Sequence, residues 1–214
     1  MTKAFIIRFH YGKDDKRFEW RFNYFKEKVL PRIKGQTVNG FDICIRCNEW
    51  HKKLFEDLGL KTFQVKDESV KYKINGRFKY FHDFASWDRV IGLEKYDLQM
   101  GLDSDDLIER NYVERILKEV ETFKLGNPTR SLHLSFQPQT INIRNGRKII
   151  GELHRYNPRK GSAFMALYQP NKENYKFIYC ESHISLWKHA DFSITLPRGY
   201  CYATIHDINE STGK

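Results

Sequence analysis

The chain has 214 residues, of which 40% are hydrophobic and 15% aromatic, a composition typical of one folded domain and not of a disordered chain. No apolar stretch reaches the roughly 20 residues that a membrane-spanning helix needs, so we expect no membrane span. The formal net charge of +10 favours anionic partners such as phosphorylated small molecules, nucleic acid or an anionic membrane surface.

The first half of the chain alternates predicted strands and helices. Apolar residues predict strands over residues 5–9, 41–46 and 62–65. The helices between them carry apolar faces, and Pro31 bends or ends the first while Gly59 closes the second. A basic, aromatic connection over residues 66–82 leads to a third helix, with Phe84, Trp87 and Ile91 on one face. This order predicts an α/β fold with a mainly parallel central sheet flanked by helices and joined by right-handed crossovers.

A run of carboxylates follows the next predicted strand, residues 96–100, whose Tyr96, Leu98 and Met100 share one face. The run reads Leu102-Asp103-Ser104-Asp105-Asp106. Apolar residues at helical spacing come next, namely Ile108, Tyr112, Ile116, Val120 and Phe123. We therefore expect Asp105 or Asp106 at the N-cap of a helix, and the carboxylates at the end of a strand, where open α/β sheets bind ligands.

Carboxylates this close repel one another unless a cation or a network of hydrogen-bond donors holds them together. Oxygen ligands suit Mg²⁺ or Mn²⁺, and Mg²⁺ takes one or two carboxylates together with substrate phosphates. The motif therefore predicts a metal–diphosphate site at Asp103 and Asp105. The alternative is that Asp103 and Asp105 or Asp106 only cap the helix and face solvent.

Cys44 and Cys47 form a Cys-x-x-Cys pair within a predicted strand. Residues three apart on a strand point to opposite faces, so the pair is not expected to share a metal ion. With four cysteines and no secretory signal in the sequence, we expect reduced, buried thiols and a cytoplasmic location.

After residue 127 the pattern changes to a mixed or antiparallel part. Strands are predicted over residues 132–136, 140–144, 148–153, 163–168, 176–180 and 200–205. Asn145-Gly146 predicts a tight hairpin turn, and a helix is possible over residues 182–190. We expect one domain over residues 1–210, with residues 211–214 as a polar tail or the start of a linker.

Three segments resemble those of a known family. Residues 89–106, RVIGLEKYDLQMGLDSDD, resemble the helix–strand–Asp-x-Asp segment of nucleotide-sugar glycosyltransferases with the GT-A fold. Residues 157–168, NPRKGSAFMALY, and 200–209, YCYATIHDIN, resemble later segments of rhamnosyltransferases, which end near a His-x-x-Asn. The whole chain is also similar to the N-terminal glycosyltransferase domain of a larger chlorovirus protein, which implies further C-terminal domains and a host cytoplasm. Gln169 stands where family members often have an acid.

The resemblance implies a GT-A-like catalytic domain. Its first half, residues 1–127, would bind the nucleotide, and its second half, residues 128–210, would bind the acceptor and complete the metal site. Asp103 would face the ribose or the metal, Asp105 would bind the metal, and His206 could reach the same ion.

Nucleotide and donor-sugar contacts are expected at the ends of the first two strands and on the helix before the motif, from Arg8, Phe9, His10, Tyr11, Arg46, Asp88 and Arg89. The alternatives are core packing for Phe9, pairing with an acid for Arg46, and a packed or surface position for His206.

The motif and the resemblance together predict a glycosyltransferase that uses Mn²⁺ or Mg²⁺, and the resemblance implies a sugar of rhamnose or glucose type. The donor would be a nucleoside-diphosphate sugar, with a pyrimidine base favoured, and the acceptor a glycan or glycoprotein. Glu181 and Asp191 are candidates for the catalytic base or for sugar contacts. The alternatives are a basic nucleic-acid-binding protein, a nuclease that uses the same carboxylates, or a glycan-binding module. For the favoured function we expect no nucleic-acid partner, because recognised nucleic-acid-binding motifs are absent from the sequence.

Overall fold

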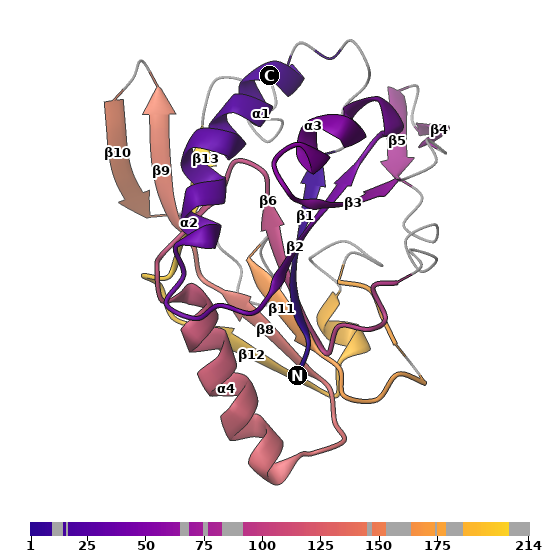
Figure 1. Cartoon of the computed structure of the whole chain (residues 1–214), viewed down its shortest axis with the longest axis vertical. Helices are drawn as coiled ribbons and strands as arrows, with labels where there is room; N and C mark the ends of the chain where they lie inside the picture. Colours follow the sequence, from indigo (N-terminus) through magenta and orange to yellow (C-terminus); the bar gives the residue numbers. More distant parts are fainter. Residues whose placement is uncertain are drawn as a thin grey trace.

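A seven-stranded sheet forms the centre of the protein in the computed structural model, which describes residues 1–9, 15, 17–64, 69–74, 77–82, 92–144, 147–152, 164–173, 175–178 and 186–205 (Figure 1). The strand order is β12-β8-β11-β6-β1-β2-β3. The bounds are β1 Lys3–Phe9, β2 Asp42–Cys47, β3 Lys61–Gln64, β6 Leu98–Asp103, β8 Leu132–Phe136, β11 Met165–Tyr168 and β12 Phe192–Leu196. Within this sheet β11 alone runs against its neighbours. The predicted α/β fold with a mainly parallel central sheet is confirmed.

Two smaller sheets stand beside the central one. The first has the order β10-β9-β13-β7 and consists of β7 (Leu107–Ile108), β9 (Gln139–Arg144), β10 (Arg147–Glu152) and β13 (Cys201–Ile205). Arg144 pairs with Arg147, which confirms the predicted two-residue hairpin connection. The second is a hairpin of β4 (Ser69–Ile74) and β5 (Arg77–His82), where we expected only a connection. Asn75-Gly76 between its strands is the same hairpin signal as Asn145-Gly146.

The helices follow the predicted apolar faces, with some changes of boundary. A continuous helical run consists of α1 (Arg17–Tyr24), the π-helical η1 (Phe25–Val29) and α2 (Leu30–Lys34). Pro31 lies in the first turn of α2, directly after the π-helical η1, and the run continues past it. The other helices are η2 (Glu49–His51), α3 (Lys52–Glu56), α4 (Tyr112–Gly126) and η5 (Leu186–His189). The helix predicted around Trp87 lies outside the described residues.

Two apolar clusters pack against the two faces of the central sheet. The first contains Phe5, Ile7 and Phe9 of β1 and receives side chains from η1, α2, α3 and α4. The second contains Ala4 and Ile6 of β1 together with residues before β6, after β11 and in η5. Alternation along β1 therefore divides its side chains between two layers of core.

The predicted thiols are confirmed as free and buried for Cys44 and Cys47. Cys44 belongs to the second cluster and Cys47 to the first, so the two side chains lie on opposite faces of the sheet. Burial raises the pKa of Cys44 to about 11 and that of Cys47 to about 12. Neither thiol is placed for shared metal binding.

The segment around the carboxylates differs from the prediction in a way that affects the site. β6 runs from Leu98 to Asp103, so Asp103 is the last residue of a strand, as expected for a ligand-binding edge. Residues 104–105 form a turn, β7 follows, and α4 begins only at Tyr112 after Asn111. The prediction that Asp105 or Asp106 caps a helix is therefore wrong.

One prediction for the second half needs correction, because residues 176–178 are not in a strand. Within the possible helix over residues 182–190, the structure describes the short 3₁₀ helix η5. The unpredicted β12 pairs in parallel with β8 and extends the sheet by one strand.

Candidate functional site

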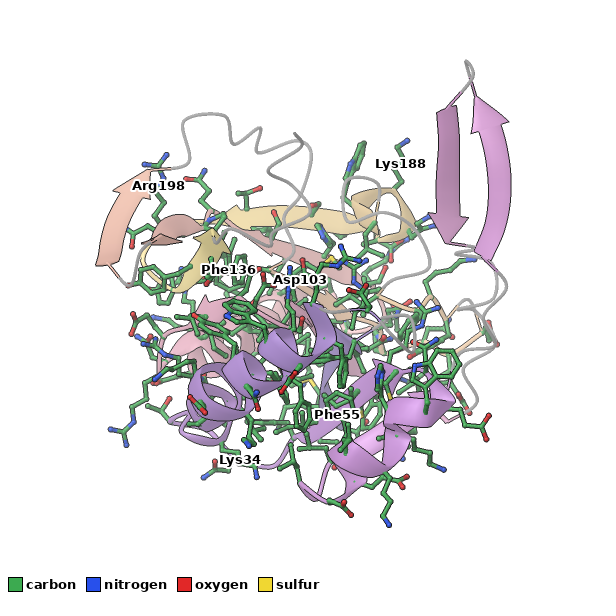
Figure 2. All side chains as sticks on the ribbon, turned by 90° about the horizontal axis from the view of Figure 1, so that it is seen from above. Lys34, Phe55, Asp103, Phe136, Lys188 and Arg198 are labelled. Carbon is green, nitrogen blue, oxygen red and sulfur yellow. The ribbon has the colours of Figure 1, made fainter. Side chains whose placement is uncertain are left out.

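The candidate site lies at the carboxyl ends of three adjacent parallel strands. In the sheet register, Arg8 of β1 is beside Arg46 of β2 on one side and beside Asp103 of β6 on the other. All three project from the face that carries Ala4 and Ile6, because side chains alternate along each strand. Charged residues thus replace apolar ones at this edge. Figure 2, which looks down on the upper end of β6, shows Asp103 near the middle of the molecule.

Arg8 and Asp103 form an ion pair that is open to solvent. Nη2 of Arg8 lies 2.9 Å from Oδ1 of Asp103, and each side chain is 32% exposed. Arg46, next to Arg8, is more enclosed and is 4% exposed. Opposite charges are therefore within reach of a ligand at the strand ends.

Asp105 is held in a buried ion pair with a residue of α1. Nη1 of Arg21 lies 2.5 Å from Oδ1 of Asp105, with the side chains 9% and 6% exposed, and the same nitrogen is 3.5 Å from Oγ of Ser104. Arg21 follows Phe18 by three residues and so lies on the inward stripe of α1. The pair connects the first helix to the turn after β6.

Asp106 is enclosed and is bound by the second sheet. Its Oδ1 accepts a hydrogen bond of 3.0 Å from the backbone N–H of Thr204 in β13. Burial, together with the nearby carboxylates of Asp105 and Asp103, raises the pKa of Asp106 well above its usual range. Asp106 therefore fixes the turn and is not placed to contact a ligand.

Two arginines and one backbone N–H thus hold the three carboxylates together. Asp103 and Asp105 offer the oxygen ligands that Mg²⁺ and Mn²⁺ prefer. Mg²⁺ commonly binds one or two carboxylates together with phosphates, and this pair supplies two. Across the described ranges, no group of three or more His, Cys, Asp or Glu side chains is arranged to hold a metal ion. An ion bound here would take its remaining ligands from a substrate or from residues outside those ranges, among which His206 is the predicted one.

Phe9 is a core residue, and the prediction that it contacts the nucleotide is wrong. Its side chain has no exposed surface, and its ring centroid lies 5.1 Å from that of Phe25 and 4.8 Å from that of Phe55. Strand alternation turns Phe9 to the face opposite Arg8, into the first apolar cluster.

Asp191 lies at the opposite edge of the sheet from Asp103. Its Oδ2 accepts hydrogen bonds of 2.8 Å from both the N–H and the hydroxyl of Ser131, and its Oδ1 accepts one of 3.1 Å from Arg130. These bonds lower the pKa of Asp191. Ser131 and Asp191 precede the parallel strands β8 and β12, which run in the same direction as β6, so they lie at the amino ends. Asp191, a predicted candidate for the catalytic base or a sugar contact, therefore lies at the other end of the strands from Asp103.

The remaining predicted site residues lie outside the described residues, namely His10, Tyr11, Asp88, Arg89, Glu181 and His206. Sequence reasoning missed Arg21 and Thr204. For Arg21 a signal was present, because a cation on the apolar stripe of a helix needs a buried partner. Thr204 contributes through its backbone, which side-chain chemistry does not reveal.

A family model described as "Putative rhamnosyl transferase" matches residues 6–214. No curated protein sequence matches the chain. No helix among the described residues is long and apolar enough to cross a bilayer.

Solved structures of Staphylococcus aureus TarS share the fold. The crystal structure of TarS 1-349 superposes with a TM-score of 0.53 at 14% identity, over 95% of this chain and 60% of that one. The same TarS fragment in complex with UDP-GlcNAc has a TM-score of 0.53 at 13% identity, over 100% of this chain and 61% of that one. The chain thus spans about 60% of the length of these TarS fragments.

Proposed function

Because the chain belongs to the family described as "Putative rhamnosyl transferase", we propose that it is a glycosyltransferase that moves a rhamnose- or glucose-type sugar from a nucleoside-diphosphate sugar with the help of a divalent metal ion. The acceptor would be a glycan or glycoprotein. Family membership favours this function over the nuclease and the non-catalytic binding module that the sequence left open.

The observation that carries the proposal is the row of Arg46, Arg8 and Asp103 at the carboxyl edge of the sheet. Open α/β sheets bind their ligands at this edge. Arginine guanidinium groups bind phosphate oxygens through paired hydrogen bonds, so Arg8 and Arg46 suit a diphosphate. TarS has been crystallised with UDP and with UDP-GlcNAc, which supports a pyrimidine donor here.

Asp103 and Asp105 would hold Mn²⁺ or Mg²⁺, with His206 as a further ligand that favours Mn²⁺. When bound, the ion would supply a Lewis acid that stabilises negative charge on the departing nucleoside diphosphate. Arg21 of α1 would neutralise the charge of Asp105 through their ion pair, while Arg8 would hold the Asp103 carboxylate at the strand end. Glu181 remains the candidate for the catalytic base.

The two halves of the proposed domain would meet at the motif. Residues 1–127 supply β1, β2 and β6, which carry Arg8, Arg46 and Asp103. Residues 128–210 supply β13, whose Thr204 binds Asp106. We infer that nucleotide binding depends mainly on the first half, and that the second half fixes the turn and serves the acceptor.

Thermal unfolding with UDP or GDP, each with and without Mn²⁺, tests this proposal. We expect UDP with Mn²⁺ at one hundred times its Kd to raise the Tm of the wild type by about 5 °C. The Asp103→Asn variant should lose this shift, because it loses the accessible carboxylate. Glu121→Gln, which removes an acid from an exposed pair on α4, should keep it.

Three results would argue against the proposal. An equal shift with and without Mn²⁺ would exclude the metal from donor binding. Equal shifts with GDP and UDP would remove the pyrimidine preference. If the Asp103→Asn variant kept the full Tm shift, the donor would not bind at the carboxyl end of β6.

A further inference from the structure

The β4–β5 hairpin, Ser69–His82, is a cationic segment that the proposed donor site does not use. Its sequence contains Lys71, Lys73, Arg77 and Lys79 but no aspartate or glutamate, although the chain as a whole has 27 acids beside 37 basic residues. Four aromatic residues occur among these cations, namely Tyr72, Phe78, Tyr80 and Phe81.

The strand register places cations opposite aromatic residues. Lys71 pairs with Tyr80, and Lys73 pairs with Phe78 two positions further along the same face. On the other face Tyr72 pairs with Lys79. Directly opposed residues of an antiparallel pair share one face, so basic and aromatic positions occur together on both faces of the hairpin.

The hairpin is tethered to the edge of the sheet that carries the candidate site. It forms a two-stranded sheet of its own, and Figure 2 shows it standing out from the rest of the molecule. It follows β3, whose last residue, Gln64, is in register with Cys47 at the carboxyl end of β2. The link from Gln64 to Ser69 can span at most about 17 Å. Its base therefore lies within about 17 Å of Gln64, on the strand next to the one that carries Arg46.

We propose that the β4–β5 hairpin is the docking arm for an anionic glycan acceptor, whose sugars carry carboxylate, phosphate or sulfate groups. The proposal rests on the glycosyl transfer proposed above, which requires an acceptor to approach this edge. The four cations pair with the anionic groups, and the aromatic rings offer apolar faces for sugar rings. A neutral glycan would leave this charge unmatched.

Binding to dextran sulfate, unmodified dextran and oligothymidylate, measured on the full chain at several salt concentrations, tests the proposal. One variant combines Lys71→Gln, Lys73→Gln, Arg77→Gln and Lys79→Gln. Its matched control removes the same charge from exposed helical positions through Lys26→Gln, Lys28→Gln, Lys34→Gln and Lys118→Gln. We expect the hairpin variant to bind dextran sulfate about ten-fold more weakly than the control does. Its affinity should also depend less steeply on salt.

A second variant, Tyr72→Leu with Tyr80→Leu, keeps every charge and separates ring contacts from charge. It should bind dextran sulfate more weakly at all salt concentrations with an unchanged salt dependence. If the hairpin variant fails to fold, Lys71→Gln with Lys79→Gln replaces it and should give a smaller loss in the same direction.

Equal losses in the hairpin and control variants would overturn the proposal, because net charge alone would then explain binding. If the wild type binds oligothymidylate more tightly than dextran sulfate, and the hairpin variant loses that binding, the arm binds nucleic acid instead. The UDP shift with Mn²⁺ separates the two proposals: the hairpin variant should retain it. Its absence from the wild type would contradict donor binding, while the dextran sulfate result would still decide the role of the hairpin.

Discussion

Among the residues around the carboxylates, Arg21 is the one whose replacement should lower the free energy of unfolding most. Its ion pair with Asp105 is buried, with side chains 9% and 6% exposed. Arg21→Met should therefore leave a buried, uncompensated carboxylate and lower the free energy of unfolding by about 3 kcal/mol. Urea denaturation at neutral pH measures this loss.

The double variant Arg21→Met with Asp105→Asn should recover part of that stability, because it removes the orphaned charge as well. Arg130→Met serves as the control, since Arg130 is 62% exposed in its pair with Asp191 and should cost below about 1 kcal/mol. Equal losses from Arg21→Met and Arg130→Met would show that the buried pair has no special weight.

His133 should make stability depend on pH. The residue is 1% exposed, and its Nδ1 lies 2.9 Å from Oγ of Ser193. Burial lowers the pKa of His133 from 6.5 to about 4. Between these values the unfolded chain binds the proton and the native protein does not, so stability is complete above pH 6.5 and falls as the pH drops toward 4.

We expect protonation of His133 to lower the free energy of unfolding of the wild type by about 2 kcal/mol between pH 7 and pH 5. His133→Gln should remove this part of the pH dependence of stability. Urea unfolding at the two pH values measures it. An unchanged slope in the variant would mean that His133 is protonated in the native protein.

Prediction from sequence succeeded for residues whose position within one element decides their surroundings. Arg8, Arg46 and Asp103 end strands, so their presence at one edge followed from periodicity and parallel order. Phe9 was misplaced because a one-residue step along a strand reverses the face. The position of Asp191 could not be predicted because the strand that follows it was not recognised.

At the scale of elements, Gln36 joins α2 to the start of α4. Its Nε2 donates to the carbonyl oxygens of Arg32 at 3.0 Å and Glu109 at 2.8 Å, and its Oε1 accepts from the N–H of Val113 at 2.9 Å. The side chain is 4% exposed. Asn111, at the N-cap of α4, makes no side-chain capping bond, and Gln36 caps the helix in its place.

Gln36→Leu should lower the free energy of unfolding by about 2 kcal/mol, because the buried N–H of Val113 and the part-buried carbonyl oxygens of Arg32 and Glu109 lose this partner. The neighbouring Thr37→Ala, which removes an exposed hydrogen bond to Glu114, should cost below about 0.5 kcal/mol. Chemical denaturation compares the two. Similar losses would contradict the capping role.

The elements themselves were largely predictable, and their boundaries at the motif were not. The apolar spacing of Tyr112, Ile116 and Val120 identified α4 correctly. Ile108 fits the same spacing but lies in β7, where it pairs with Cys201. A residue that satisfies a helical pattern is drawn into a strand when a distant segment supplies the backbone partners.

Thiol reactivity can report whether the two faces of the sheet open together. Cys44 lies in the second cluster and Cys47 in the first, and both are buried. In a Cys180→Ser variant with Cys201→Ala, we expect both thiols to react with a thiol reagent only through unfolding of the whole domain. Peptide mapping after timed labelling should show equal rates at the two positions.

A faster rate at Cys44 than at Cys47 would contradict this expectation, because it would mean that the second cluster opens alone. Labelling in increasing urea provides the check, since a shared opening should give both rates the same dependence on denaturant.

The sequence by itself determined the α/β class, the parallel first half and the placement of Asp103 at a strand end. These follow from periodicity and from the direction of neighbouring strands, which are local properties. Tertiary structure alone decided the partners of the carboxylates: Arg21 for Asp105, and the backbone of Thr204 for Asp106. Such contacts join segments far apart in the chain, and which of many possible cations or N–H groups meets a carboxylate depends on how the layers pack.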